Sequence, residues 1–357
     1  MAVTFESPIP PMLARSIDTI PETDGMSYEP KWDGFRGIVY FDGERVEIAS
    51  RGSKTMTRYF PELVDTFVQQ LPGPCVLDGE IVIRSGARGA EHLDWEALGQ
   101  RIHPAESRIR KLAEETPATY IAFDLLSLGD KSYLDEPFSE RRAALERLAS
   151  EVGLADPIHL TQTTEDSGRA RRWLDEFEGA GLDGVVAKPL AEPYAPGKRT
   201  MFKVKHHRSA DVVLIGYRIH ASGRGVGSLL LALYDENGVL VSVGGASAFS
   251  DARRIALIGE LEPLVERDDS GNVKTGETER SRFSSGKDTS FVRLRPERVV
   301  EVRYDHMEGA RFRHTAQFNR WRPDREPASC TYAQLDSPIT FNLGDIVPGL
   351  GATGETI

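Results

Sequence analysis

Residues 29–36 read Glu29-Pro30-Lys31-Trp32-Asp33-Gly34-Phe35-Arg36, and this stretch decides how the rest of the chain is interpreted. Strand-like alternation runs from Tyr28 to Ser50, and Asp42-Gly43 interrupts it with a hairpin turn signal. Lys31 therefore stands between two strand segments, at a turn where its amine can face a cleft. A single Lys-x-Asp-Gly also fits an ordinary surface hairpin, so the remaining segments must decide.

Five further segments each bring a charged or aromatic side chain to the end of a predicted strand. They are Ser50-Arg51-Gly52, Leu77-Asp78-Gly79-Glu80, Ala122-Phe123-Asp124-Leu125, Asp183-Gly184-Val185-Val186-Ala187-Lys188 and Phe202-Lys203-Val204-Lys205. Glu80 and Asp183 carry the hard oxygen ligands that Mg²⁺ prefers, and Phe123 offers a face on which a base can stack.

A lysine amine is a poor nucleophile at neutral pH because it is protonated. Neighbouring cations such as Arg36, Lys203 and Lys205, together with a bound divalent ion, would disfavour the protonated form and free the lone pair of Lys31. The same cations would neutralise charge on a phosphate under attack. Lys31, these cations and the two carboxylates together therefore indicate an enzyme that transfers a nucleotide through a covalent lysine adduct.

The first part of the chain is predicted to be a mixed α/β domain with antiparallel hairpins. Helices are expected over 61–70, 139–152 and 170–180, and strands over 75–83, 120–126 and 184–188, in addition to the hairpin of 28–50. After a basic cluster at 203–208 the pattern changes to short strands, which places the domain boundary near Arg208.

The second part is predicted to be a small barrel. Strands are expected over 212–217, 228–234, 239–244 and 299–304, with one helix over about 251–265. These four strands and one helix are compatible with an OB-like barrel, which has five strands. Residues 266–290 are polar and rich in Gly, Ser and Thr, so a long exposed loop is expected there.

Composition narrows the class of protein without deciding it. The chain has 357 residues, a net charge of −11 and two cysteines, Cys75 and Cys330, which cannot build a disulfide framework or a zinc finger. The net negative charge, taken alone, argues against a protein that binds nucleic acid. However, nine arginines stand between Arg293 and Arg325, with Arg282 just before them, and a local basic groove is compatible with overall acidity. With no membrane span or signal peptide expected, we predict the cytoplasm, at the nucleoid.

The six motifs, in this order and at this spacing, resemble the covalent nucleotidyltransferases, and within them the ATP-dependent DNA ligases. The resemblance begins at Pro11-Met12-Leu13-Ala14 and ends at Arg322-Pro323-Asp324-Arg325, so it covers almost the whole chain. It implies an α+β, ATP-grasp-like adenylyltransferase domain over residues 1–207, and an all-β OB-fold barrel domain over residues 208–357.

The resemblance also implies a role for each matching residue. Lys31 would form lysyl-AMP, and Asp33 would assist nick sealing. Glu29 would lie at the adenine edge, with Phe123 and Val186 on the two faces of the base. The phosphates and ribose would be held by Arg36, Glu80, Lys203 and Lys205, while Arg51 would lie near the 5′-phosphate of the nick. Arg322, Asp324 and Arg325 would orient the leaving pyrophosphate, and Glu80 and Asp183 would hold the metal.

Three positions depart from the family pattern. Met201-Phe202 precede Lys203 where many members have Trp, an apolar substitution that changes no chemistry. The other two are charged residues. Asp183 stands where Glu is common, one methylene shorter, and Arg325 stands where Lys is usual. The first makes a metal role for Asp183 weaker than that for Glu80, and the second keeps the charge but changes its geometry.

The expected substrates are ATP, as the AMP donor, with Mg²⁺ or Mn²⁺, and nicked double-stranded DNA bound by a monomer in DNA repair. NAD⁺ is not expected as the donor. Two other enzymes remain open alternatives, an RNA ligase and an mRNA-capping guanylyltransferase. A third alternative, of another class, is an inactive module that binds nicks.

Overall fold

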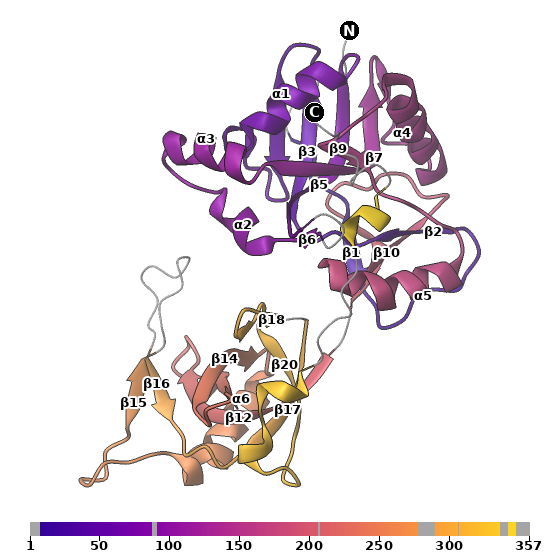
Figure 1. Cartoon of the computed structure of the whole chain (residues 1–357). Helices are drawn as coiled ribbons and strands as arrows, with labels where there is room; N and C mark the ends of the chain where they lie inside the picture. The colour runs from indigo at the N-terminus through magenta and orange to yellow at the C-terminus, as the bar shows by residue number, and fades with distance from the viewer. Residues whose placement is uncertain are drawn as a thin grey trace. The chain divides into compact units, whose positions relative to one another are not determined.

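The computed structural model describes residues 8–87, 91–205, 208–277, 290–305, 307–335 and 342–347 (Figure 1). The chain divides into two compact units, one of residues 1–206 with 338–357 and the other of residues 207–337. Among the residues described, none forms a helix long and apolar enough to cross a membrane.

The larger sheet of the first unit has seven strands, with helices packed against it (Figure 1). Its main path runs β4 (Val46–Ser50), β3 (Phe35–Phe41), β5 (Cys75–Ser85), β7 (Ala118–Leu128) and β8 (Lys131–Ser132), while β6 (His92–Leu93) pairs with β5 and β9 (Ile158–Leu160) with β7. The helices of this part are α1 (Pro61–Gln70), α2 (Trp95–Gln100), α3 (Glu106–Glu115) and α4 (Phe138–Val152), preceded by the 3₁₀ turn η1 (Thr57–Tyr59). Apolar side chains of α1 and α4, such as Phe67 and Leu145, share one core with Leu77 and Tyr120 of the sheet.

The smaller sheet of the first unit carries the lysine-bearing segments. Its order is β1 (Leu13–Ser16), β11 (Arg199–Val204), β10 (Val185–Pro189) and β2 (Met26–Pro30). Helix α5 (Ser167–Glu176) and the 3₁₀ turn η2 (Phe177–Ala180) share a core with it, which includes Trp173 and Val185.

The second unit contains a ring of five strands joined by hydrogen bonds. Strand β12 (Arg208–Ile219) pairs with β13 (Val226–Tyr234), which pairs with β14 (Leu240–Ser247); β14 pairs in parallel with β20 (Ala316–Trp321), and β17 (Val299–Tyr304) joins β20 back to β12. This circuit is closed, and its interior is filled by apolar side chains such as Val213, Leu231 and Val300.

The remaining elements of the chain are short, except for one helix. Helix α6 (Asp251–Leu261) follows β14, and β15 (Thr275–Glu277) and β16 (Ser290–Arg293) form a ribbon that extends the sheet from β12. A two-stranded piece joins β18 (Met307–Glu308) to β19 (Arg311–Phe312). The other 3₁₀ turns are η3 (Glu262–Leu264), η4 (Pro327–Ser329), η5 (Tyr332–Gln334) and η6 (Leu343–Asp345).

The expectation of a mixed α/β first part is confirmed. The helix predicted over 251–265 ends at Leu261 and continues only as η3, where Pro263 has no N–H to donate. The loop expected over 266–290 is wrong in part, because Thr275–Glu277 pairs with Ser290–Val292. Gly276 allows this, since a Cβ there would lie 2.5 Å from the Phe291 ring. Residues 278–289 lie outside the described residues.

The chain end is a second correction. Residues 342–347 were expected in the second domain with 208–357, but they pack in the first unit. Leu343, Ile346 and Val347 are buried in the core that contains Trp173, and the Leu343 N–H donates to the Glu91 carbonyl at 3.0 Å. Burial of these three apolar side chains is favourable in free energy. They therefore pack in the first unit, although they follow the second unit in the sequence.

Candidate active site

A cavity of about 400 Å³ opens between the two sheets of the first unit. The small sheet contributes residues of all four strands, and the large sheet contributes the start of β3, the end of β4 and the middle of β5 and β7. The sequence-predicted residues that line it are Glu29, Lys31, Asp33, Arg36, Arg51, Glu80, Phe123, Val186 and Lys203. The fold thus brings together side chains that are up to 174 positions apart in the chain.

Lys31 is fixed at the cavity by its own backbone. It follows the last residue of β2, its N–H donates to the Gly184 carbonyl at 2.8 Å, and its carbonyl accepts from Asp183 N–H at 2.9 Å. Two glycines make this approach possible. A Cβ on Gly34 would lie 2.2 Å from the Ile81 carbonyl oxygen, and one on Gly184, whose φ is +132°, would lie 2.0 Å from the Val204 carbonyl oxygen.

The Lys31 ammonium is paired with a carboxylate. Its Nζ lies 2.6 Å from Asp183 Oδ2, and Lys205 Nζ lies 3.0 Å from the same oxygen. Burial alone would raise the pKa of the Asp183 carboxyl, but the two ammonium groups hold that pKa below its ordinary value. Burial, Lys31 and Lys205 together lower the pKa of the Lys203 amine. Three lysines therefore converge around one carboxylate.

A row of side chains crosses the small sheet and faces the cavity. Glu29 of β2 lies opposite Val186 of β10, and Val186 lies opposite Lys203 of β11. Directly opposite residues point to the same face, and residues two apart along a strand share it too. Lys31 lies two residues after Glu29, and Lys188 lies two residues after Val186. Both lysines therefore share the face of the sheet that this row occupies.

Lys188 was not among the residues singled out from the sequence, although it lines the cavity. Its buried Nζ lies 2.8 Å from Glu29 Oε1, donates to the Phe123 carbonyl at 3.2 Å and lies 4.7 Å from the centre of the Phe123 ring. Glu29 Oε2 is buried and has no hydrogen-bond partner among the residues that the structure describes. Burial raises the pKa of the Glu29 carboxyl even though Lys188 opposes that effect. The signal that could have found Lys188 is its place at the end of the 183–188 motif.

Arg36 is held rigidly on the opposite wall. Its Nε and Nη2 each lie 2.5 Å from one oxygen of Asp78, and its guanidinium lies 4.6 Å over the Phe123 ring. Asp78 is buried and also accepts from the Tyr194 hydroxyl at 2.7 Å, while that hydroxyl accepts from Met12 N–H at 2.9 Å. Asp78 and Tyr194 were not predicted as site residues.

Glu80 is the carboxylate best placed to meet a cation in the cavity. Burial raises its pKa to about 7, although Arg36 and Lys31 act in the opposite direction and the Gly34 N–H donates to it. A carboxylate that is costly to ionise gains from a divalent ion beside it. Within the described ranges, no group of three or more His, Cys, Asp or Glu side chains is arranged to hold a metal. Mg²⁺ needs only one or two carboxylates beside phosphate and water, so Glu80 fits this use.

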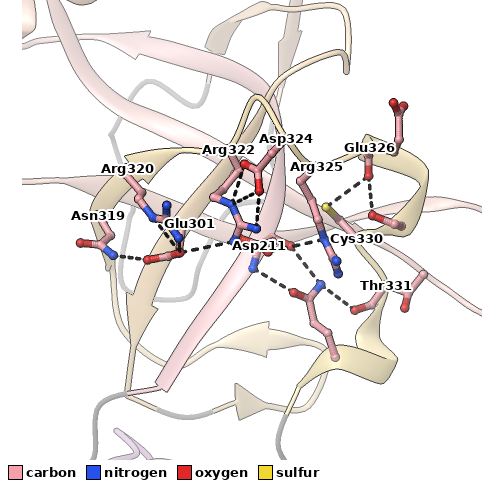
Figure 2. Close-up of polar contacts among 12 residues, drawn as sticks. Asp211, Glu301, Asn319, Arg320, Arg322, Asp324, Arg325, Glu326, Cys330 and Thr331 are labelled. Carbon is pink, nitrogen blue, oxygen red and sulfur yellow. Dashed lines mark hydrogen bonds and ion pairs between the residues drawn. The ribbon is translucent and has the colours of Figure 1, made fainter.

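Arg322, Asp324 and Arg325 lie in the second unit, in the segment that follows β20. Arg322 is enclosed by the carboxylates of Asp211, Glu301 and Asp324 (Figure 2). Arg325 Nε lies 3.5 Å from Asp211 Oδ2. The residues that line a hollow of about 530 Å³ in this unit include Trp321, Arg322 and Arg325.

Family models match both parts of the chain. Residues 11–205 match the "ATP dependent DNA ligase domain", and residues 222–325 match the "ATP dependent DNA ligase C terminal region". The chain therefore belongs to the ATP-dependent DNA ligases and is an enzyme of that class.

Two mycobacterial relatives match nearly the full length. One is DNA ligase C of Mycobacterium tuberculosis, 58% identical over 98% of this chain and 100% of that protein. Another is DNA ligase C2 of Mycolicibacterium smegmatis, 58% identical over 93% and 95%. A solved structure from a study of Lig E DNA ligases shares the fold, with a TM-score of 0.54, 16% identity and coverage of 87% of this chain and 98% of that one.

Proposed function

We propose that this chain seals nicks that carry a 5′-phosphate and a 3′-hydroxyl in double-stranded DNA, through lysyl-AMP on Lys31 and then an adenylated DNA strand. The observation that carries the proposal is the position of Lys31 in a cavity whose lining holds five cationic side chains and three carboxylates. The cations are Lys31, Arg36, Arg51, Lys188 and Lys203, and the carboxylates are Glu29, Asp33 and Glu80. Such a lining suits a polyanionic nucleotide.

In the first step Lys31 Nζ attacks the α-phosphorus of ATP. A phosphorus–nitrogen bond forms, the bond from that phosphorus to the bridging oxygen breaks, and pyrophosphate leaves. The amine must lose a proton, and neighbouring cations with a bound divalent ion were expected to disfavour its protonated form. The partner of Nζ is instead the Asp183 carboxylate at 2.6 Å, which is close enough to take the proton. Lys203 and Lys205 remain to balance charge on the α-phosphate.

In the second step the AMP passes to the 5′-phosphate of the nick, and the lysine amine is released. In the third step the 3′-hydroxyl attacks that phosphate, the new phosphodiester bond forms, and AMP leaves. Arg51, at the cavity rim, would contact the 5′-phosphate, and Asp33, two residues from Lys31, would act on the 3′-hydroxyl.

The base site favours adenine over guanine. Glu29 Oε2 is a buried acceptor that no donor in the described part of the chain reaches, and the exocyclic amino group of adenine supplies one. Guanine presents a carbonyl oxygen at that edge, which would meet the carboxylate with repulsion. Phe123 and Val186, on opposite walls of the cavity, would enclose the two faces of the base.

Glu80 would hold Mg²⁺ or Mn²⁺, with Asp183 as a second carboxylate. A bound divalent cation would supply positive charge beside the α-phosphate. Asp183 is the weaker candidate, because two lysines already share its Oδ2.

We further propose that the second unit is an OB fold. Its closed five-strand circuit, with α6 between the third and fourth strands of the ring, supports this. In this proposal the boundary between the adenylyltransferase and OB domains lies at 207/208, residues 342–347 return to the first unit, and Arg322, Asp324 and Arg325 orient the pyrophosphate that leaves in the first step.

The substrate is proposed to be nicked duplex DNA bound by a monomer during DNA repair. Phosphate contacts would make the affinity fall as salt rises. A sealing assay tests the proposal: the purified chain is given ATP or GTP, with nicked DNA–DNA or RNA–RNA duplexes. We expect sealing of DNA with ATP only. Sealing of RNA alone would support an RNA ligase, an adduct with GTP would support a guanylyltransferase, and nick binding without any adduct would support an inactive module.

A further inference from the structure

The Arg322 guanidinium is surrounded by three carboxylates that do not hold it equally (Figure 2). Nη1 lies 2.9 and 2.8 Å from the two oxygens of Asp211 and 3.4 Å from Glu301 Oε2. Nε and Nη2 both point to Asp324, at 3.0 and 2.9 Å from its oxygens. One end of the guanidinium therefore rests on strand residues, and its other edge rests on a residue of the following segment.

Asp211 and Glu301 form an unusual pair. They are in register on the neighbouring strands β12 and β17, so two like charges face each other directly. Such a pair destabilises a sheet unless a cation lies between the carboxylates. Arg322 Nη1 provides that cation, and Arg320, in register with Glu301 on β20, lies 2.8 Å from the same Oε2 of Glu301. The register of the two strands thus makes this acidic pair a receptor, meaning a binding site, for a guanidinium.

Asp211 is the rigid member of this receptor. Its N–H donates to Gln334 Oε1 and its carbonyl accepts from Gln334 Nε2, both at 2.9 Å. Its side chain is 13% exposed, whereas that of Asp324 is 62% exposed. The Nε/Nη2 edge of Arg322 is consequently the edge from which an incoming anion can displace a carboxylate, and that edge also matches phosphate in a two-pronged contact.

We propose that Asp211, assisted by Glu301, is a positioning residue for the adenylation step: it anchors Nη1 of Arg322 by hydrogen bonds and attracts Arg325 as an ion pair, so that both arginines are aligned for the phosphates of ATP. The inference rests on the proposed function, in which Arg322 and Arg325 act on the leaving pyrophosphate. It adds a residue on β12, more than a hundred positions before that segment in the chain.

The experiment separates the steps of the reaction. Asp211→Asn keeps the shape and removes the charge, and we expect it to slow formation of the lysyl-AMP adduct about tenfold, with a higher KM for ATP. Sealing of a pre-adenylated nick, which needs no pyrophosphate to leave, should stay within about twofold of the parent chain. Asp211→Glu should recover part of the adenylation rate. Glu262→Gln, which breaks an exposed ion pair with Arg267 in the same unit, is the matched control and should change neither rate.

Equal slowing of adenylation and of pre-adenylated sealing by Asp211→Asn would overturn the inference, because it would mean a general structural role. An unchanged adenylation rate would also overturn it. If Asp211→Asn does not fold, Glu301→Gln takes its place, and it should slow adenylation by a smaller factor while leaving sealing unaltered. Absence of any adduct on the parent chain would instead contradict the proposed function.

Discussion

Glu80→Gln should change how the stability of the first unit depends on pH. Burial raises the pKa of Glu80 from 4.5 to about 7, so the folded state binds this proton more tightly than the unfolded state does. Below about pH 4.5 the carboxyl is neutral in both states and costs nothing. As pH rises towards 7, the unfolded chain ionises first, and the parent chain loses stability. Glutamine is neutral throughout and removes this loss.

The size of the effect follows from the two pKa values. A group moved from 4.5 to about 7 contributes at most about 3 kcal/mol to the pH dependence of the free energy of unfolding. The advantage of Glu80→Gln over the parent should therefore grow by up to about 3 kcal/mol between pH 4.5 and 7, and level off above that.

Urea unfolding of both chains, followed by tryptophan fluorescence at several pH values, measures this difference. Three of the four tryptophans, Trp32, Trp95 and Trp173, lie in the first unit. Subtracting the two curves cancels the other titrating groups. Mg²⁺ should stabilise the parent at pH 8 more than it stabilises Glu80→Gln, because only the parent carries the proposed ligand. A difference that is constant with pH, or that shrinks as pH rises, would refute the reasoning.

Three further changes test other contacts. Tyr194→Phe removes a hydrogen bond to the carboxylate of Asp78 and should raise the KM for ATP in adduct formation about tenfold; an unchanged KM would contradict the role given to this contact. Lys188→Met leaves Glu29 buried without its cation and should lower the free energy of unfolding by about 3–5 kcal/mol, measured by thermal unfolding. Adding Glu29→Gln should recover most of this loss; a single variant as stable as the parent would contradict the prediction. Deletion of residues 342–357 should destabilise the first unit by about 5 kcal/mol, measured by thermal unfolding, while deletion of 348–357 alone is the control; equal melting of the two would count against the burial argument.

The sequence predicted those parts of the fold that local chemistry controls. The strand predicted over 299–304 coincides with β17, and Asp42-Gly43 does lie between β3 and β4. Helices α2 and α3 were missed. Helix α3 has only Ile109 and Leu112 buried, so its pattern of apolar residues is too sparse to mark a helix against a polar loop. The ribbon strands read Thr-Gly-Glu in β15 and Ser-Phe-Val-Arg in β16, which are too short to show an alternation of apolar and polar residues.

The candidate site divides in the same way. Motif residues such as Lys31 and Glu80 could be named from short local patterns, and the structure places them in one cavity. Tyr194 could not be found that way, because its importance depends on a hydrogen bond to Asp78, 116 positions away. Nor could Asp211 be found, because its partner Glu301 becomes a neighbour only when β12 pairs with β17. Long-range register decides such contacts, and no single segment encodes it.

The most direct test of the central claim is the mass of the chain after incubation with ATP and Mg²⁺, with the adduct located by peptide mapping. We expect one added AMP on the peptide that contains Lys31, lost when the protein meets nicked DNA, and none on Lys31→Ala. An adduct that persists in Lys31→Ala, or that maps to Lys188, Lys203 or Lys205, would contradict it.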